Sequence, residues 1–480
     1  MLRSPSKKKI LQDIDSSQFR GMILPDRLCT TEFRLAMDDI RIMLLSVLSV
    51  ILDRCDRRPD YHFIDTKVDF RTGRDYEDED PICGRKTIYG WIQGRGLEAL
   101  ATHKAWIESS KYIDISLRKE LCYRIKKNIR EIFENLENIR RKNKGHLFFM
   151  MDYYGTPLRL SESGKLEKYD TDLFLKSNFS DLFYVKGMVS AAKVLDDKDK
   201  IEESCQLFKN IVQNIDAGLF VSDQQDVNCF AQKNKQDKRC VSHTPWMICI
   251  GALTKFIELT GDPYYKGIGF KFIERIIKYH VNIENNISSF KKFDMWEHID
   301  NEGRPYINSD GSCISDSGHA LEFVGLALKF IRINEQLGLL SDINDNVYHI
   351  REILIGILIR NFNNGYSLNN LGICKSIDLL SRCPLNTDMP WWSLPEAIRA
   401  AIEASRIVGK NEQSSIIEIA KKCYNSFITY YVKRSLNLMA IPSVDKNGCI
   451  SNFYPATPDM DPGYHTGLCF IDCLNILNHA

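Results

Sequence analysis

An even spacing of loop-to-helix junctions is the feature that most constrains how this chain can fold. His243, His319 and His465 each stand where a polar loop gives way to an apolar, helix-like segment. The first two are 76 residues apart, and Trp392 stands 73 residues after His319 and 73 before His465. Arg95 lies 148 residues before His243, which is two steps of 74, so one more junction is expected between them. Six evenly spaced junctions are typical of a ring of six helical hairpins, whose core is buried only when the ring is complete.

Helical periodicity predicts pairs of helices between these junctions. Residues 121–139 and 347–358 carry apolar side chains at steps of three and four, with charged residues between them. Residues 245–259 and 318–330 are apolar nearly all round, which is typical of helices that are packed on both sides. We expect five pairs of one inner and one outer helix: 95–108 with 114–142, 178–194 with 198–214, 245–260 with 264–281, 319–337 with 343–361, and 393–407 with 412–434.

The fold that this order predicts is an all-α (α/α)6 barrel. The last inner helix, 465–478, has no partner after it, so residues 31–55 are expected to supply its outer helix. We expect residues 1–30, with the basic cluster 7–9, to form an N-terminal tail and residues 31–480 to form a single barrel domain. Long polar loops lead into the junctions and are expected to form the walls of the site, with short β-hairpins on one open face: 71–88, 216–242, 297–318, 381–390 and 440–463. The skipped junction is expected in the polar stretch 169–180.

Composition narrows the classes of function. The 64 Lys and Arg residues nearly balance 63 Asp and Glu residues, so no net field favours nucleic acid or an anionic membrane. The 15 cysteines are scattered without the close pairs of a zinc site, so we expect neither a disulfide framework nor a metal site. The most apolar run, 42–52, is well short of the roughly 20 residues that cross a bilayer. We therefore expect a soluble, cytoplasmic protein with reduced thiols.

Two of the junction histidines stand in motifs that suit proton transfer. Residues 318–322 read Gly-His-x-x-Glu, which places His319 and Glu322 on one face of a helix. Glu322 could fix one nitrogen of the imidazole while the other exchanges a proton with a ligand. His465 stands between Gly463 and Gly467 after a proline-broken stretch. The alternatives are a helix cap with a first-turn acid for the first motif and a turn residue for the second.

Aromatic residues and carboxylates accompany the other junctions. Trp391 and Trp392 are followed by Glu396, and indole faces are suitable platforms for the apolar face of a sugar ring. They could equally be core tryptophans at a normal helix start.

The junction at Arg95 combines an aromatic residue, an amide and a guanidinium. Tyr89, Gln93 and Arg95 could hold an oxygen-rich ligand, and the guanidinium could stabilise negative charge that forms on it. Arg95 could instead neutralise an acid of the barrel, and His243 could be a buried histidine at a helix start.

Together, these motifs resemble those of the N-acylglucosamine 2-epimerase superfamily, from about residue 85 to the C-terminus. The resemblance rests on Gln-Gly-Arg at 93–95, His243, Gly-His-x-x-Glu at 318–322, Trp-Trp-x-x-x-Glu at 391–396 and Tyr-His at 464–465. Members of this superfamily are (α/α)6 barrels that epimerise or isomerise sugars at carbon 2 without a metal or redox cofactor. The resemblance implies an isomerase that acts on a small-molecule sugar and needs no cofactor. Because members of the superfamily often form dimers, a homodimer is the assembly to look for.

The resemblance also implies roles for individual residues. His319 and His465 would be the acid/base pair: one removes the proton from carbon 2, giving a cis-enediolate, and the other returns a proton. An imidazole with a pKa near about 6.5 is well matched to this step. Arg95 would stabilise the enediolate oxygen, and His243 would help to open the ring. The histidines would be oriented by Glu322 and Glu396. From their residue types and places at the junctions, we expect the substrate contacts to be Tyr89, Gln93, Trp391, Trp392 and Asp181.

The sequence departs from the superfamily at several substrate-contact positions. Ser317 stands where many members have proline, 243–246 reads His-Thr-Pro-Trp, and Leu394-Pro395 replaces a glutamine. A lysine common before the final Tyr-His is replaced by 459–461. The substrate contacts are therefore the part that transfers least.

Two other classes of function remain open. A glycoside or unsaturated-uronide hydrolase on a six-hairpin barrel would use paired carboxylates, and Asp181, Glu322 and Glu396 are the candidates. A non-catalytic carbohydrate-binding protein would use the same cavity without turnover.

Overall fold

The computed structural model describes most of the chain, and its described residues form two compact units. The described residues are 20–25, 30–161, 163–169, 176–227, 240–284, 287–340, 344–433 and 438–478. The first unit holds those of 1–227, 431–441 and 456–474, and the second holds those of 228–430, 442–455 and 475–480. Most of the expected N-terminal tail, including the basic cluster 7–9, lies outside the described residues, as do 170–175 of the expected skipped junction.

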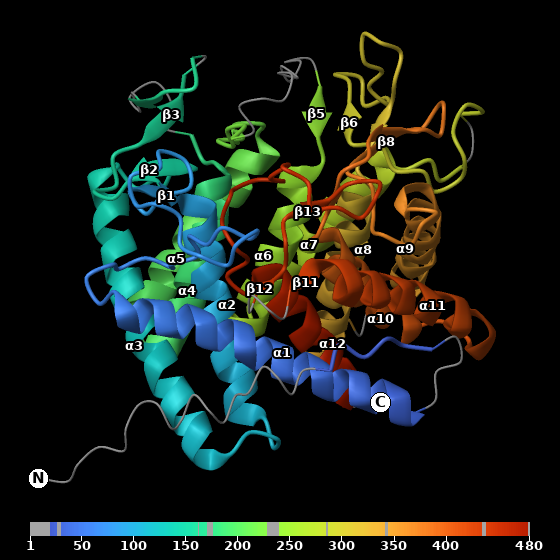
Figure 1. Ribbon diagram of the computed structural model, residues 1–480. Coiled ribbons are helices and arrows are strands. Elements are labelled where there is room, and N and C mark those ends of the chain that lie inside the picture. Colours follow the sequence, from blue (N-terminus) through green and yellow to red (C-terminus); the bar gives the residue numbers. More distant parts are fainter. Residues whose placement is uncertain are drawn as a thin grey trace, which may run out of the picture. The chain divides into compact units, whose positions relative to one another are not determined.

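The first unit is built from helical pairs. Its helices are α1 (Thr30–Arg57), α2 (Gly90–Ser109), α3 (Ile115–Lys142), α4 (Phe179–Leu195) and α5 (Lys198–Asp216). Helix α2 packs on α3, α4 packs on α5, and α2 also packs on α4, so α2 and α4 are the inner members of two adjacent hairpins (Figure 1). A π-helical turn, η6 (Tyr464–Leu468), packs on α2 and leads into α12 (Cys469–Asn478).

The second unit repeats this arrangement with three pairs. Its helices are α6 (Thr244–Thr260), α7 (Tyr264–His280), α8 (Ser317–Gln336), α9 (Asn344–Gly365), α10 (Ser393–Ser405) and α11 (Lys410–Ser426), after which the chain forms the π-helical turn η4 (Phe427–Tyr431). The pairs are α6 with α7, α8 with α9 and α10 with α11, and α8 packs on both α6 and α10. The predicted pairing of helices is therefore confirmed within each unit.

The burial of the helices matches the predicted contrast between inner and outer members. Every residue of α10 is buried, and so is the stretch from Phe179 to Ala192 of α4. The outer helices α3 and α5 bury only the apolar residues of one face. Because an inner helix is covered on all sides, it can lack charged residues, whereas an outer helix needs them on its solvent face.

Helix α2 begins at Gly90, five residues before the predicted start at 95. It approaches α4 closely enough for backbone contact: a Cβ on Gly94 would lie 2.6 Å from the carbonyl carbon of Phe183, and a Cβ on Gly187 would lie 2.5 Å from the carbonyl oxygen of Gly94. Glycine at both positions is what allows these two inner helices to pack so closely.

Short antiparallel strands pair in the segments between the helices, which agrees with the expected short β-hairpins. In the first unit, β1 (Thr87–Tyr89) pairs with β2 (Met150–Asp152), β3 (Leu158–Leu160) with β4 (Leu166–Lys168), and β11 (Val432–Lys433) with β12 (Leu438–Met439). In the second, β5 (Val241–Ser242) pairs with β6 (His298–Ile299), β10 (Met389–Pro390) with β13 (Ser443–Val444), and β8 (Ser376–Asp378) with both β7 (Ile314–Ser315) and β9 (Pro384–Asn386).

One hairpin geometry recurs at the period of the helical repeat. At Asp152, Asp300 and Asp445, the side chain accepts hydrogen bonds from the backbone N–H groups two and four residues later, and a glycine with positive φ stands three residues later. The first two aspartates are 148 residues apart and the last two are 145 apart. The same local structure at these intervals supports an internal repeat of about 74 residues, independently of the junction residues.

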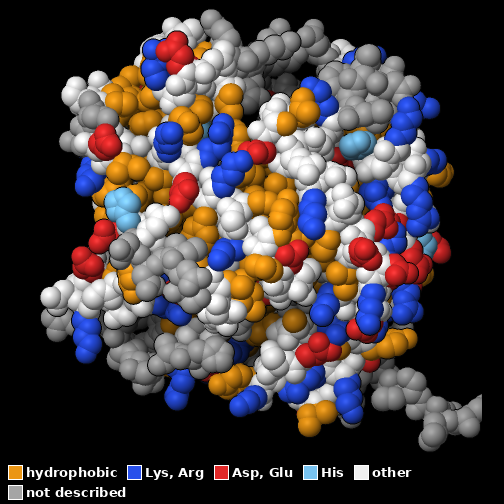
Figure 2. All heavy atoms as spheres, turned by 180° about the vertical axis from the view of Figure 1, so that it is seen from behind, with side chains coloured by type: hydrophobic (Ala, Val, Ile, Leu, Met, Phe, Trp, Pro, Cys, Tyr) orange, Lys and Arg blue, Asp and Glu red, His pale blue; other side chains and the backbone are white. Residues whose placement is uncertain are grey.

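The surface carries no extended region of one charge on the face shown in Figure 2, where Lys and Arg side chains alternate with Asp, Glu and hydrophobic ones. This agrees with the nearly balanced composition. None of the helices in the described ranges combines the length and apolar character needed to span a bilayer.

Candidate functional site

The start of α8 places His319 beside two carboxylates of the second unit. Asp316 caps the helix by accepting a hydrogen bond from the backbone N–H of His319. The ring nitrogen Nδ1 of His319 lies 3.1 Å from Oε2 of Glu297 and 3.5 Å from Oδ2 of Asp316. Because Nδ1 is engaged, proton exchange with a ligand would use Nε2, and the side chain is 22% exposed.

Glu297 is held by the segment that precedes α6. The pairing of β5 with β6 brings residues 242–244 alongside Glu297. Its Oε1 accepts hydrogen bonds from the hydroxyls of Ser242 and Thr244, and its Oε2 lies 3.3 Å from Nε2 of His243. One carboxylate oxygen thus serves two imidazoles, those of His243 and His319.

This arrangement changes the protonation of both partners. Burial alone would lower the pKa of His319, but the charges of Asp316 and Glu297 raise it to about 9. Burial alone would raise the pKa of Glu297, but His243 and His319 hold it well below its ordinary value. At neutral pH, His319 is therefore an imidazolium and Glu297 a carboxylate. In this state His319 carries a proton that it can donate.

Trp392 and Lys375 complete the surroundings of His319. The indole of Trp392 lies 5.3 Å from the imidazole of His319, ring centroid to ring centroid, at an angle of 31°. Lys375 Nζ lies 2.5 Å from Oδ2 of Asp316 and 5.6 Å from the centroid of the Trp392 ring. Burial opposes the charge of Lys375, but Asp316 raises its pKa, so the ammonium persists. We call His243, Glu297, Asp316, His319, Lys375 and Trp392 the His319 cluster.

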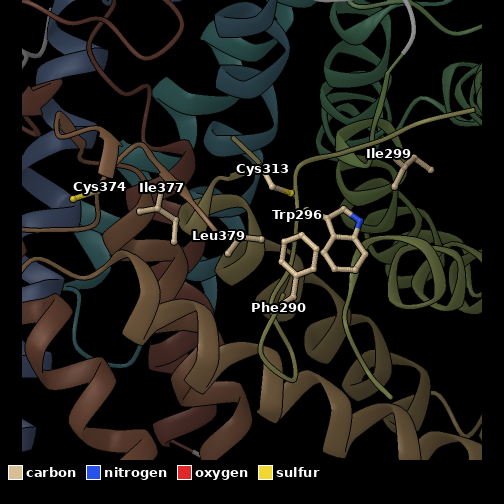
Figure 3. Packing of buried hydrophobic residues seen from close by; sticks show 7 residues of the cluster. All are labelled: Phe290, Trp296, Ile299, Cys313, Cys374, Ile377 and Leu379. Carbon is tan, nitrogen blue, oxygen red and sulfur yellow. The ribbon is translucent and has the colours of Figure 1, made fainter. Parts of the chain in front are cut away.

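An apolar cluster fixes the loops that carry Glu297 and Lys375. Trp296 and Cys374, their chain neighbours, belong to one buried group of side chains, shown in Figure 3: Phe290, Trp296, Ile299, Cys313, Cys374, Ile377 and Leu379. The indole of Trp296 also donates to the carbonyl of Tyr279. In Figure 1, β5, β6 and β8 stand at the same end of the helices of the second unit. The loops at this end are therefore packed segments that can hold side chains in place.

Glu322 and Glu396 form a second acidic pair in the same unit. They present carboxylate oxygens within 4.8 Å of each other. Glu396 is buried and ion-paired with Arg399 of the same helix. The sequence predicted that Glu322 would fix the imidazole of His319, but the carboxylate at Nδ1 is that of Glu297. Trp391 and Trp392 are both largely buried, 9% and 8% exposed.

The donor set of the His319 cluster also meets the minimum for a metal site. The nitrogens of His243 and His319 and an oxygen of Glu297 lie within 4.8 Å of one another. A zinc-bound imidazole ordinarily donates its second nitrogen to a carboxylate or carbonyl. The buried Nδ1 of His243 has no such hydrogen-bond partner among the described residues. We therefore interpret the three residues as a hydrogen-bonded group and not as a metal centre.

The first unit holds a second group of predicted residues around Arg95. Its guanidinium carbon lies 4.1 Å from the ring centroid of Phe183 and 5.3 Å from those of Trp91 and Tyr464. The ring of His465 lies 4.9 Å from that of Tyr464, at 90°. We call Arg95, Glu98, Lys186, Tyr464 and His465 the His465 cluster; α2, α4 and η6 supply its members.

Three predicted substrate contacts have their polar groups engaged within the first unit. The hydroxyl of Tyr89 donates to the carbonyl of Ile82, and the amide of Gln93 bonds both backbone groups of Ile64. The carboxylate of Asp181 accepts from the ring of His146 and from the backbone N–H of Leu147. A substrate contact by these three residues remains a prediction, because the contacts that the structure shows are to the protein itself.

Asp223 is a carboxyl group that the sequence did not single out, and it is bonded to Trp91, whose ring lies beside Arg95. It accepts from Ser180 Oγ at 2.5 Å and from Trp91 Nε1 at 3.2 Å. Burial raises its pKa to about 6. No short motif surrounds this residue. Glu297, by contrast, stands in a Trp-Glu-His run at the start of a long loop, which is a signal that could have been used.

The fold is shared with several carbohydrate-active enzymes. A cellobiose 2-epimerase from Spirochaeta thermophila matches with a TM-score of 0.62 and 12% identity over 94% of this chain and 98% of that one. A D-mannose isomerase matches with a TM-score of 0.57 and 13% identity over 90% and 98%. An unsaturated glucuronyl hydrolase from Streptococcus agalactiae matches with a TM-score of 0.50 and 12% identity over 98% of each chain.

These matches confirm the predicted class, an all-α (α/α)6 fold with short β-hairpins. At such low identity they establish the fold and leave the activity open. No protein-family model matches the sequence, and no curated protein matches it either.

Proposed function

We propose that this chain is a cofactor-independent sugar epimerase or isomerase that moves a proton at carbon 2 of a reducing sugar. The observation that carries the proposal is the imidazole of His319, which is held at Nδ1 by Glu297 and lies beside the indole of Trp392. The likeness of the fold to a cellobiose 2-epimerase and a D-mannose isomerase supports the same class.

The charge on His319 suggests which role it takes. With a pKa of about 9, His319 enters the reaction protonated and acts as the donor. The base is then the second histidine of the sequence motifs, His465, which takes the proton from carbon 2. The electron pair of the broken C–H bond forms the double bond between carbons 1 and 2, and the carbonyl oxygen becomes an enediolate oxygen. Arg95 is proposed to stabilise that oxygen.

Return of the proton decides the product. Transfer from the imidazolium to the opposite face of carbon 2 restores the aldehyde and gives the epimer. Transfer to carbon 1 gives the ketose: the hydroxyl proton on the oxygen of carbon 2 passes to the oxygen of carbon 1, and the carbonyl forms at carbon 2. His243, hydrogen-bonded to the same carboxylate as His319, is proposed to assist ring opening.

The test is isotope exchange. The protein is incubated in heavy water with glucose, mannose, N-acetylglucosamine and cellobiose, and the sugars are followed by NMR. Deuterium is expected at carbon 2 or carbon 1 of at least one sugar, and the His465→Asn variant, which lacks the proposed base, is expected to incorporate it far more slowly. Absence of exchange with all monosaccharides, N-acyl sugars and disaccharides tried would contradict the proposal.

A hydrolase is the second candidate, favoured by the close approach of the Glu322 and Glu396 carboxylates. The carboxylate of Glu396 is ion-paired with Arg399 of its own helix and is therefore already engaged within the protein, which is why we rank this function second. Release of reducing sugar from an unsaturated uronide, lost in Glu396→Gln and kept in His465→Ala, would reverse the ranking. If the protein binds sugars without any turnover, and alanine at His319 or His465 leaves the affinity unchanged, a non-catalytic carbohydrate-binding protein would be favoured instead.

A further inference from the structure

The turn that carries His465 is pressed against the ring of His103. A Cβ on Gly463 would lie 2.9 Å from Cε1 of His103, and one on Gly467 would lie 2.2 Å from the same atom. Gly463 also has a φ of +82°, which glycine adopts without strain. Only glycine on both sides of His465 therefore permits this contact. Short π-helical turns such as η6 are found frequently at functional sites.

Asp461 fixes the backbone of the same turn. Its buried carboxylate accepts hydrogen bonds from the backbone N–H of Tyr464 at 3.0 Å, from that of Thr466 at 3.1 Å and from the hydroxyl of Thr466 at 2.6 Å. These bonds hold the backbone on either side of His465. They do not fix the side chain of Tyr464, the residue before it.

A buried ion pair fixes that side chain. Lys186 of α4 donates to the hydroxyl of Tyr464 at 2.6 Å, and its Nζ lies 3.0 Å from Oε2 of Glu98 on α2. The side chains of Lys186 and Glu98 are only 4% and 3% exposed. The ring of Tyr464 is in turn packed with Ala99 and Leu468 and lies edge-on to Phe183.

Burying such a pair costs desolvation free energy that an apolar pair of the same size would not incur. The presence of such a pair is therefore weak evidence for a role in stability. Here, the pair fixes the position of the Tyr464 hydroxyl, one residue before His465. A reacting group displaced by about 1 Å can lose on the order of a hundredfold in rate.

We propose that Lys186, paired with Glu98, is a positioning residue for His465. Lys186 acts on His465 indirectly, by holding the hydroxyl of Tyr464. The inference rests on the proposed function of His465 as an acid/base residue. It concerns residues of the first unit only, and none of the sequence motifs included Lys186.

The experiment compares two ways of removing the same contact. The double variant Glu98→Met with Lys186→Met removes both charges together, so that neither is left buried alone. Tyr464→Phe removes only the hydroxyl that Lys186 contacts. Each is expected to lower kcat at least about tenfold with a smaller change in KM. The triple variant combines these three substitutions. It is expected to have a kcat no lower than the lower of the two test variants, because the substitutions act through the same contact. The matched control is Lys104→Met with Glu108→Met, an ion pair on α2 in which Lys104 is partly buried and Glu108 is exposed, and it is expected to keep the wild-type kcat.

A second readout does not need turnover. Histidine labelled with carbon-13 at Cε1 is followed by NMR, and the signal of His465 is identified by its loss in His465→Asn. Both test variants are expected to shift or split this signal and to move its titration midpoint, whereas the control leaves it unchanged. If the wild-type protein proved inactive on every sugar, the proposed function would be wrong. The NMR signal of His465 would still show whether Lys186 positions that residue.

The inference is overturned if both test variants are folded and retain the wild-type kcat and the wild-type His465 signal. If the double variant does not fold, Tyr464→Phe alone decides in the same way. A fall in thermal stability with kcat and the His465 signal unchanged would show a purely structural ion pair and would likewise overturn it.

Discussion

Nδ1 of His319 lies 3.1 Å from Oε2 of Glu297, a carboxylate that the loop before α8 brings to the start of that helix. The same oxygen lies 3.3 Å from Nε2 of His243. This shared carboxylate sets the charge of the imidazole on which the proposed chemistry depends. The sequence motif predicted that Glu322 would hold the imidazole of His319, whereas in the structure Glu297 lies at its Nδ1.

Glu297→Gln should move the alkaline limb of activity to lower pH. In the wild type, His319 is protonated below a pKa of about 9, so a reaction that needs it as donor loses rate only above that pH. Without the negative charge of Glu297 the pKa falls, and the loss of rate should begin roughly 1 to 3 pH units lower. The pH profile of kcat measures this. Glu302→Gln, in the exposed part of the same loop, is the control and should leave the profile unchanged. An unshifted profile in Glu297→Gln would remove the donor role from His319.

His319→Asn and His465→Asn should each lower the rate of product formation by about 10² to 10⁴, the usual contribution of a positioned acid or base. Incubation with the sugar that the wild type turns over, followed by NMR, measures the rate. His349, on the exposed surface of α9, provides the control variant His349→Asn, which should form product at the wild-type rate. Should one of the two active-site variants form product at the wild-type rate, the two-histidine mechanism would be wrong for that residue.

Arg332→Met should destabilise the second unit without affecting the chemistry. Arg332 of α8 makes three hydrogen bonds of 2.8 to 3.0 Å to the buried carboxylate of Glu403 on α10. Removing one partner leaves the other charge buried, at a cost of about 3 to 5 kcal/mol in the free energy of unfolding. Urea unfolding measures the loss, and Arg332→Met with Glu403→Met should recover most of it. Arg304→Met, which breaks an exposed ion pair, should change stability little. A small effect of Arg332→Met would mean that the charge of Glu403 is compensated in another way, by Arg406 at 3.7 Å or by water.

Treatment with EDTA should leave turnover unchanged. Although His243, Glu297 and His319 offer three donor atoms within 4.8 Å, their hydrogen bonds to one another account for the grouping. The measurement is kcat before and after chelation and dialysis, with elemental analysis of the protein. Loss of activity that Zn²⁺ restores, together with one equivalent of metal that His243→Ala lacks, would make this group a metal site.

Much of the fold could be predicted from the sequence because its signals are local. The apolar periodicity of 121–139 and the all-round apolar character of 245–259 distinguish outer from inner helices within single segments. The bounds agree within a few residues, for example 264–281 predicted and Tyr264–His280 observed for α7. Helix α2 differs at its start, where pairing of β1 with β2 leads the chain straight into the helix at Gly90. The helix predicted over 412–434 differs at its end: α11 stops at Ser426, and η4 and β11 follow.

The sequence by itself determined the succession of helical hairpins, their inner and outer members, and the histidines at the junctions, because a period of 3.6 residues and a repeat near 74 can be read along one dimension. Only the tertiary structure decided the partners of those histidines. Glu297 reaches His319 across 22 residues, and Lys186 reaches Tyr464 across 278. Such contacts are set by the packing of helices and loops from distant parts of the chain, and no spacing within a motif encodes them.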